Sequence, residues 1–130
     1  DIKKVANSME EIYIKKGECI IKEGAEADAM YIVVDGEFMC YRESSSNILS
    51  TCQKGDYFGE LGVIFGEQRQ ASVKASTDSV AWRLKGKDFL DAYRKAKLIK
   101  LGAASWLFLL LDSQKTNLPV IKPTIHLFKR

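Results

Sequence analysis

Histidine is almost absent from this sequence of 130 residues, in which His126 is the single example. Catalytic triads and dyads need a histidine beside the nucleophile, and jelly-roll metalloenzymes of the cupin type need several around a metal. One histidine in the final stretch cannot fill these roles. We therefore expect a chain that is not an enzyme and holds no metal, with a cupin-type metalloenzyme as a distant alternative.

Long apolar runs and runs of one charge are also missing. The longest apolar stretch, 101–111, is shorter than a membrane span, which needs about 20 apolar residues. The chain has 20 Lys and Arg against 17 Asp and Glu, and these charges are spread without a basic patch. We expect neither a membrane nor a nucleic-acid partner.

Cysteine is scarce and scattered, with Cys19, Cys40 and Cys52 in no CxxC or metal-ligand spacing. Such cysteines are typical of reduced thiols in a cytoplasmic protein. The sequence opens at Asp1 without a signal peptide or an initiating Met, so we expect a fragment of a longer protein.

Short β-prone segments separated by turns make up most of what is present up to residue 84. They are 12–14, 19–21, 30–34, 37–41, 48–52, 71–75 and 80–84. Their near-regular spacing indicates a β-sandwich, jelly roll or barrel. The Asp35–Gly36 pair between two of them predicts a hairpin.

Two helices interrupt or follow the β-prone segments. Glu60–Phe65 reads as a short helix ended by Gly66 in a left-handed cap, and Lys87–Lys100 keeps a 3.6-residue apolar period. We therefore expect one domain over residues 1–100, with a β-roll at 11–84 and a C-terminal helix at 87–100. Residues 101–130 form an apolar and then irregular tail that we interpret as the start of a neighbouring region.

The segment around the short helix combines features that suit a nucleotide. The start of a helix presents free N–H groups to an anion, and Gly59 and Gly62 let the backbone approach a ligand closely. Arg69 can make a two-pronged contact with a phosphate, and the Glu60 carboxylate can accept hydrogen bonds from hydroxyls. A phosphate next to a hydroxyl is what a nucleotide offers.

These residues also match a known family. The match consists of Phe58-Gly59-Glu60-Leu61, Gly66, Arg69 and Ala71-Ser72-Val73. The segment resembles the phosphate-binding cassette of cyclic nucleotide-binding domains, most closely that of the cAMP- and cGMP-dependent protein kinase (regulatory subunit) family. The resemblance covers residues 3–97. It implies a mainly β fold with flanking helices, namely an eight-stranded jelly-roll-like β-roll with a short phosphate-binding helix and a C-terminal helix.

The resemblance also assigns a ligand site. Its members are Gly59, Glu60, Leu61, Gly62, Arg69, Gln70, Ala71 and Cys40. By resemblance, Arg69 binds the phosphate oxygens, Glu60 accepts the ribose 2′-hydroxyl with support from the Gly59 carbonyl, and Cys40 lies against the base. The family tends to have Ala or Thr where this chain has Gln70, so the choice between cAMP and cGMP stays open.

Four further residues receive roles outside the pocket wall. Asp28 is expected to orient the arginine, Val63 to be the allosteric hinge, and Trp106 and Phe108 to cap the base. Cys40 and Val63 would also be core residues in any β-roll, which is the alternative for both.

The resemblance implies a regulatory module rather than a catalyst. The expected ligand is cAMP or cGMP, with no other cofactor. Binding would relieve the inhibition of a protein kinase catalytic domain, in cis or in trans. The alternative is a cyclic nucleotide-sensing module of a channel or another effector.

Overall fold

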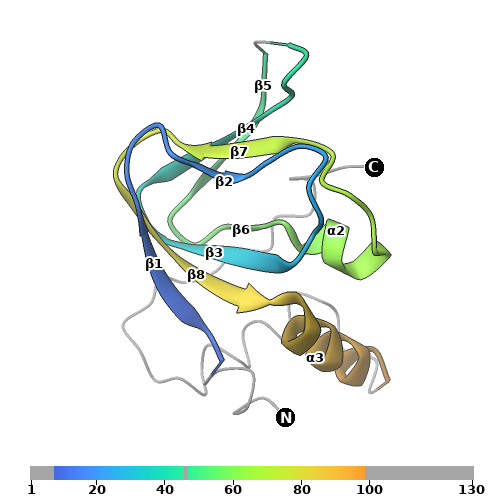
Figure 1. Cartoon of the computed structure of the whole chain (residues 1–130). Helices are drawn as coiled ribbons and strands as arrows, with labels where there is room; N and C mark the ends of the chain where they lie inside the picture. Colours follow the sequence, from blue (N-terminus) through green and yellow to red (C-terminus); the bar gives the residue numbers. More distant parts are fainter. Residues whose placement is uncertain (1–7, 46, 99–130) are drawn as a thin grey trace.

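Two antiparallel sheets face each other and form most of the molecule (Figure 1). The computed structural model describes residues 8–45 and 47–98. Its strands are β1 (Glu10–Ile14), β2 (Cys19–Ile21), β3 (Ala29–Asp35), β4 (Glu37–Tyr41), β5 (Ile48–Gln53), β6 (Tyr57–Phe58), β7 (Ser72–Ala75) and β8 (Ser79–Lys85). Its helices are α2 (Glu60–Phe65) and α3 (Gly86–Leu98).

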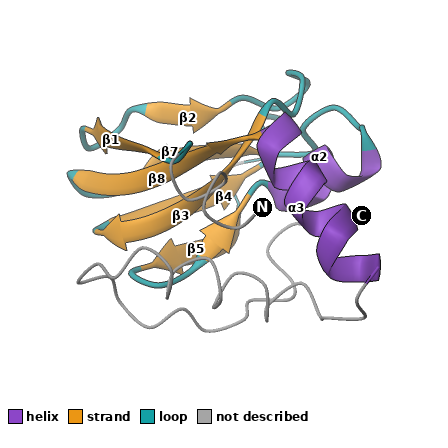
Figure 2. Ribbon diagram, turned by 90° about the horizontal axis from the view of Figure 1, so that it is seen from below, coloured by secondary structure: helices purple, strands orange, loops and turns teal. Residues whose placement is uncertain are grey.

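The strand order is that of a jelly-roll-like β-roll. One sheet runs β1-β8-β3-β6 and the other runs β2-β7-β4-β5, so neighbours in a sheet are mostly far apart in sequence. The short helix α2 is inserted between β6 and β7, and α3 follows the last strand. Figure 2 shows both helices at the same end of the sheets. The predicted fold class, including its eight strands and two helical elements, is confirmed.

Strand β3 is buried on both of its faces, which explains its nearly continuous apolar sequence. Side chains alternate across a strand, so Ala29, Tyr31 and Val33 point between the two sheets, where they join one apolar cluster. Met30 and Ile32 point the other way and join a second cluster on the outer face of the sheet. A strand between two apolar layers has no polar face.

Helix α3 covers that outer face. Its Phe89 and Ala92 pack in the second cluster with Leu84 of β8 and with Val63 of α2. Phe89 is 2% exposed, and burial of such a side chain contributes roughly 1.5–3 kcal/mol. The apolar side chains whose spacing predicted this helix therefore form the face that packs beside α2.

The helix boundaries differ slightly from those expected. The structure starts α3 at Gly86, one residue before the expected Lys87, and the last described residue of the helix is Leu98, so the expected end at residue 100 lies outside the described residues. Neither described helix has the length and apolar character needed to cross a membrane. The tail at 101–130 lies outside the described residues.

The hairpin predicted at Asp35–Gly36 is wrong. Strands β3 and β4 belong to different sheets, so the chain crosses between sheets at Gly36 instead of folding back on itself. Gly36 has φ 91° and packs directly on Ser79, whose hydroxyl accepts a hydrogen bond from the Glu37 N–H at 3.1 Å. A Cβ on Gly36 would lie 2.2 Å from Ser79 Oγ and 2.8 Å from Ser79 Cα. This tight crossing, rather than a hairpin turn, requires the glycine.

We expect Gly36→Ala to destabilise the fold far more than Gly17→Ala. Both glycines have positive φ, at 91° and 87°, but a Cβ on Gly17 would meet no atom within 4 Å. Gly17→Ala should lower the free energy of unfolding by ~1 kcal/mol through backbone strain alone, whereas Gly36→Ala should lower it by more than ~3 kcal/mol. Urea denaturation measures both, and equal losses would contradict the account of the crossing.

Candidate functional site

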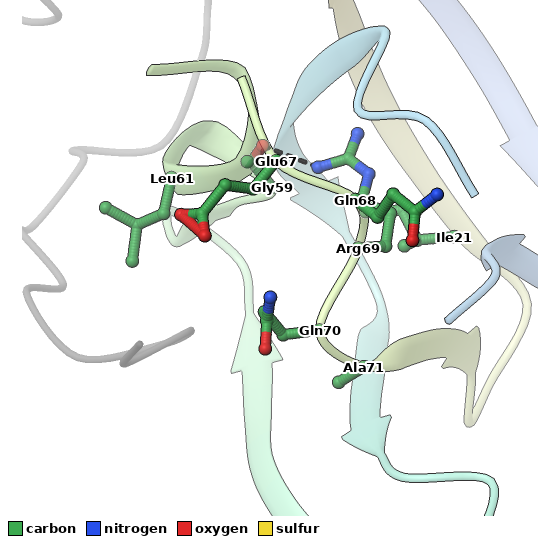
Figure 3. Close-up of a pocket in the computed structure, with 9 residues that line it drawn as sticks. Ile21, Gly59, Leu61, Glu67, Gln68, Arg69, Gln70 and Ala71 are labelled. Atoms are coloured by element: carbon green, nitrogen blue, oxygen red, sulfur yellow. Dashed lines mark hydrogen bonds between the residues drawn. The ribbon is translucent and has the colours of Figure 1, made fainter. Parts of the chain in front are cut away.

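A cavity open to solvent lies where α2 and the loop after it meet the end of β2. The space inside it is about 370 Å³, which includes space open to solvent. Figure 3 shows its lining side chains. They are Ile21, Gly59, Leu61, Gly62, Glu67, Gln68, Arg69, Gln70 and Ala71.

Three glycines give the segment around this cavity its shape. Gly59 precedes α2 with φ 84°, and Gly66 ends the helix with φ 63°, both in the left-handed region that disfavours other residues. Gly62 lies so close to the preceding loop that a Cβ on it would come within 2.8 Å of the Ala27 Cβ. The predicted short helix and its Gly66 cap are confirmed.

Arg69 is the buried charge of the site, with 7% of its surface exposed. Its guanidinium donates to the Gly59 carbonyl at 2.6 Å and to the Ala29 carbonyl, and Figure 3 shows it turned toward α2. Burial lowers the pKa of Arg69, while Tyr31 and the carboxylates of Asp28 and Glu60 oppose that shift. Both hydrogen-bond partners are neutral oxygens, so this cation lacks a hydrogen-bonded anion in the described part of the chain.

Asp28 does not bond Arg69 in the structure. Its carboxylate accepts from Arg83 Nη2 at 3.3 Å and is exposed, whereas the neighbouring main-chain carbonyl of Ala29 receives the Arg69 guanidinium. The arginine-orienting role predicted for the Asp28 side chain is therefore filled here by two backbone carbonyls. Asp28 acts on Arg69 only as a nearby negative charge.

Glu60 has an unusual environment for a carboxylate. Its Oε1 is buried and has no hydrogen-bond partner among the described residues. Burial raises its pKa from 4.5 to about 7, although the backbone N–H groups of Glu60 and Leu61 and the charge of Arg69 lower it. An orphaned carboxylate oxygen near a buried arginine is an acceptor available to a ligand hydroxyl.

Six of the eight predicted ligand-binding residues line the cavity, and Glu60 and Cys40 do not. One oxygen of the Glu60 carboxylate, Oε1, is buried instead of facing the cavity. Cys40 is fully buried between the sheets because it is an inward residue of β4. The structure thus places Cys40 in the core, and its contact with a base stays a prediction.

Val63 is also a core residue, 5% exposed, in the cluster that contains Phe89 and Ala92 of α3. It links the cavity helix to α3, as a hinge residue must, and its allosteric role stays a prediction. Trp106 and Phe108, the predicted base caps, lie outside the described residues, as does His126.

Three residues that line the cavity and the backbone carbonyl of Ala29 were not predicted from the sequence. Glu67 and Gln68 immediately precede Arg69, so their position in the same loop was a usable signal. Ile21 reaches the cavity only through the pairing of β2 with β7, and the Ala29 carbonyl has no signature in the sequence. In the part of the chain that the structure describes, no three His, Cys, Asp or Glu side chains form a group that could hold a metal ion.

Comparison with known proteins agrees with this geometry. The family described as cyclic nucleotide-binding domain matches residues 11–96, which is more than half of the chain. The chain belongs to the cyclic nucleotide-binding domain family, whose members are regulatory ligand-binding modules.

The chain is similar to proteins of different overall types. It is 39% identical over 75 residues to a cAMP-dependent protein kinase regulatory subunit of Emericella nidulans, covering 58% of this chain and 18% of that protein. It is 37% identical over 75 residues to an uncharacterized ABC transporter ATP-binding protein of Mycobacterium bovis, covering 55% and 23%. The chain therefore spans about a quarter or less of the length of these relatives.

A solved structure extends the similarity to the fold. The regulatory domain of Toxoplasma gondii PKA, crystallised with cAMP, superposes with a TM-score of 0.65 at 28% identity, covering 68% of this chain and 35% of that one. The expected kinship with kinase regulatory domains is confirmed.

We expect the stability of the ligand-free chain to fall as the pH rises through about 7. The folded state binds the Glu60 proton more tightly than the unfolded state, because the pKa of Glu60 is raised from 4.5 to about 7. This contribution is fully present below pH 4.5 and is lost above about 7, by roughly 1–3 kcal/mol. Denaturation of the wild type and Glu60→Gln between pH 4.5 and 8 measures it.

Glu26→Gln is the matched control, because Glu26 is exposed. Glu26→Gln should keep the pH slope of the wild type, and Glu60→Gln should flatten it. Equal slopes in all three proteins would contradict the assignment of a protonated Glu60.

Proposed function

We propose that this chain binds a 3′,5′-cyclic nucleotide in the cavity beside α2 and changes the packing of α3 in response. The observation that carries the proposal is the buried Arg69 guanidinium, which lines an open cavity and, among the residues that the structure describes, has only carbonyl oxygens as hydrogen-bond partners. A phosphate would supply the missing anion through charge-assisted hydrogen bonds. Gly59, Gly62 and Ala71 add no bulky side chain to the surrounding wall.

The second half of the ligand is a sugar hydroxyl. Glu60 Oε1 is a buried acceptor without a partner in the described part of the chain, and Glu60 directly follows Gly59. Because the oxygen does not line the cavity, we propose that a small shift of α2 on binding brings it to the ribose. A hydroxyl that donates to the carboxylate would favour its ionised form and lower its pKa.

The proposed base is inferred from the relatives and from Gln70. The Emericella nidulans relative is named for cAMP, and the Toxoplasma gondii domain was crystallised with it, which favours cAMP. Gln70 lines the cavity and is exposed, and its amide has both a donor and an acceptor to offer a base. We propose cAMP as the preferred ligand and cGMP as its competitor.

The response to the ligand would pass through the apolar cluster beneath α2. Val63 shares that cluster with Phe89 and Ala92, and a Cβ on Gly86 would lie 3.3 Å from Val63 Cγ1. The Gly86 N–H also donates to the Asp28 carbonyl at 2.7 Å, one residue before the carbonyl that receives Arg69. A ligand that binds better when α2 and α3 are repacked shifts the population toward that state, by no more than its difference in affinity.

In the whole protein, we propose that this shift relieves the inhibition of a protein kinase catalytic domain. The similarity to kinase regulatory subunits supports a kinase, and the Mycobacterium bovis relative supports a different effector as the second candidate. Kinase activity would be measured with the full-length protein, with and without cAMP. Inhibition that cAMP relieves supports the kinase, and an absence of inhibition favours another effector.

We expect Arg69→Ala to weaken the binding of cAMP by about 2–5 kcal/mol, or at least roughly 30-fold. Arg69→Lys keeps the charge but loses the two-pronged fork, so its affinity should fall between the wild type and Arg69→Ala. Isothermal titration calorimetry with cAMP, cGMP and 5′-AMP measures the affinities. The acyclic 5′-AMP should bind weakly to every variant.

Lys54→Ala is the matched control, because it removes one positive charge from an exposed turn. It should bind cAMP as the wild type does. If Arg69→Ala also kept the wild-type affinity, the assignment of this cavity as the ligand site would be wrong.

A further inference from the structure

Two residues that line the cavity, Gln70 and Ala71, belong to a short strip of chain that is fastened at both ends. At the first end, the Arg69 N–H donates to the Ala25 carbonyl at 2.8 Å, and the Gly24 N–H donates to the Arg69 carbonyl at 2.9 Å. These two bonds tie the strip to the loop between β2 and β3. The other end of the strip is Ser72.

The Ser72 hydroxyl is completely buried and has a partner on each side. It donates to Oε1 of Glu43 at 3.0 Å and accepts from the N–H of Glu23 at 2.9 Å. Glu23 follows β2, and Glu43 follows β4. These are the two strands that flank β7 in its sheet (Figure 1), so the Ser72 hydroxyl joins the start of β7 to the segments that follow both of its neighbours. A buried hydroxyl with both bonds made has a fixed orientation.

Glu43 is the member of this group that holds it together. Its Oε1 also accepts from Lys22 Nζ at 2.8 Å, and its N–H donates to Oε1 of Glu23 at 2.9 Å. The Lys22 and Glu43 side chains are 67% and 40% exposed, so their ion pair by itself contributes little. The bond to Ser72 differs from this ion pair because the Ser72 hydroxyl is fully buried. We name Lys22, Glu23, Glu43 and Ser72 the clamp.

We propose that Glu43 is a positioning residue for the ligand site, because its hydrogen bond to Ser72 holds Gln70 and Ala71 in place as the cavity wall. Glu43 itself does not line the cavity. This inference rests on the proposed function, and it adds a residue on the β4–β5 connection to a site otherwise built by α2 and its following loop.

An electrostatic role and a positioning role of Glu43 predict opposite changes in ligand affinity when its side chain is removed. A cyclic nucleotide is an anion, so a nearby carboxylate repels it, and removal of Glu43 by simple electrostatics would tighten binding. By the same reasoning, removal of Lys22 would weaken binding. If the role of Glu43 is to fix Ser72, its removal weakens binding and removal of Lys22 changes little.

The test is the affinity for cAMP of the whole chain and three variants, measured by calorimetry. Glu43→Ala should bind about three- to tenfold more weakly, which corresponds to the loss of one hydrogen bond. Glu43→Gln keeps an oxygen that can accept from Ser72 and should stay within about twofold of the wild type. Lys22→Ala should also stay within about twofold.

Two outcomes would overturn the proposal. Equal or tighter binding by Glu43→Ala would show that the wall holds its position without the clamp. Equal weakening by Glu43→Gln and Glu43→Ala would show that the effect does not depend on an acceptor for the Ser72 hydroxyl.

A second measurement without ligand separates this proposal from the proposed function. Amide hydrogen exchange at Arg69, whose N–H bonds Ala25, should be at least about threefold faster in Glu43→Ala than in the wild type. The Val33 N–H, which bonds the Asp56 carbonyl at 2.8 Å, is the matched control and should not change. Unchanged exchange at Arg69 would overturn the clamp. Failure of the wild type to bind any cyclic nucleotide would overturn the proposed function alone.

Discussion

A buried arginine with neutral partners is the constraint on which the rest of the site depends. Arg69 is 7% exposed, and its two hydrogen bonds within the described chain go to the carbonyls of Gly59 and Ala29. A guanidinium has five N–H donors, and a buried cation without an anion is costly to the folded state. The fold tolerates this arrangement at the mouth of a cavity, where an anionic ligand can complete it.

The two carbonyls that accept from Arg69 belong to residues at the starts of α2 and β3. Gly59 is the N-cap of α2, and Ala29 is the first residue of β3, the strand buried on both of its faces. The residue before Ala29 contributes its carbonyl to the first N–H of α3. The Arg69 guanidinium and the start of α3 are thus bonded to the neighbouring residues Ala29 and Asp28, and Val63 links α2 to α3. We propose that a change at the arginine reaches α3 through both connections.

The sequence was sufficient where local chemistry decides the outcome. Gly59, Glu60 and Arg69 at their spacing pointed to the cyclic nucleotide-binding family, which is confirmed. Gly66 identified the end of α2, because a left-handed cap depends on residue type. The prediction of a hairpin at Asp35–Gly36 was wrong because long-range pairing decides which sheet a strand joins. Gly36 is needed because the backbone there packs closely on Ser79. Cys40 and Glu60 were expected in the pocket. The alternation of side chains along β4 points Cys40 into the core, and Glu60 Oε1 is buried instead of facing the cavity. The two-residue strand β6 and the Ala29 carbonyl had no pattern by which they could be found.

A crystal structure of the chain grown with cAMP tests the account most directly. It should show phosphate oxygens within hydrogen-bond distance of the Arg69 guanidinium, and Glu60 Oε1 accepting from the ribose hydroxyl. Nucleotide bound at another surface, with Arg69 still on its two carbonyls and Glu60 Oε1 still without a partner, would contradict it.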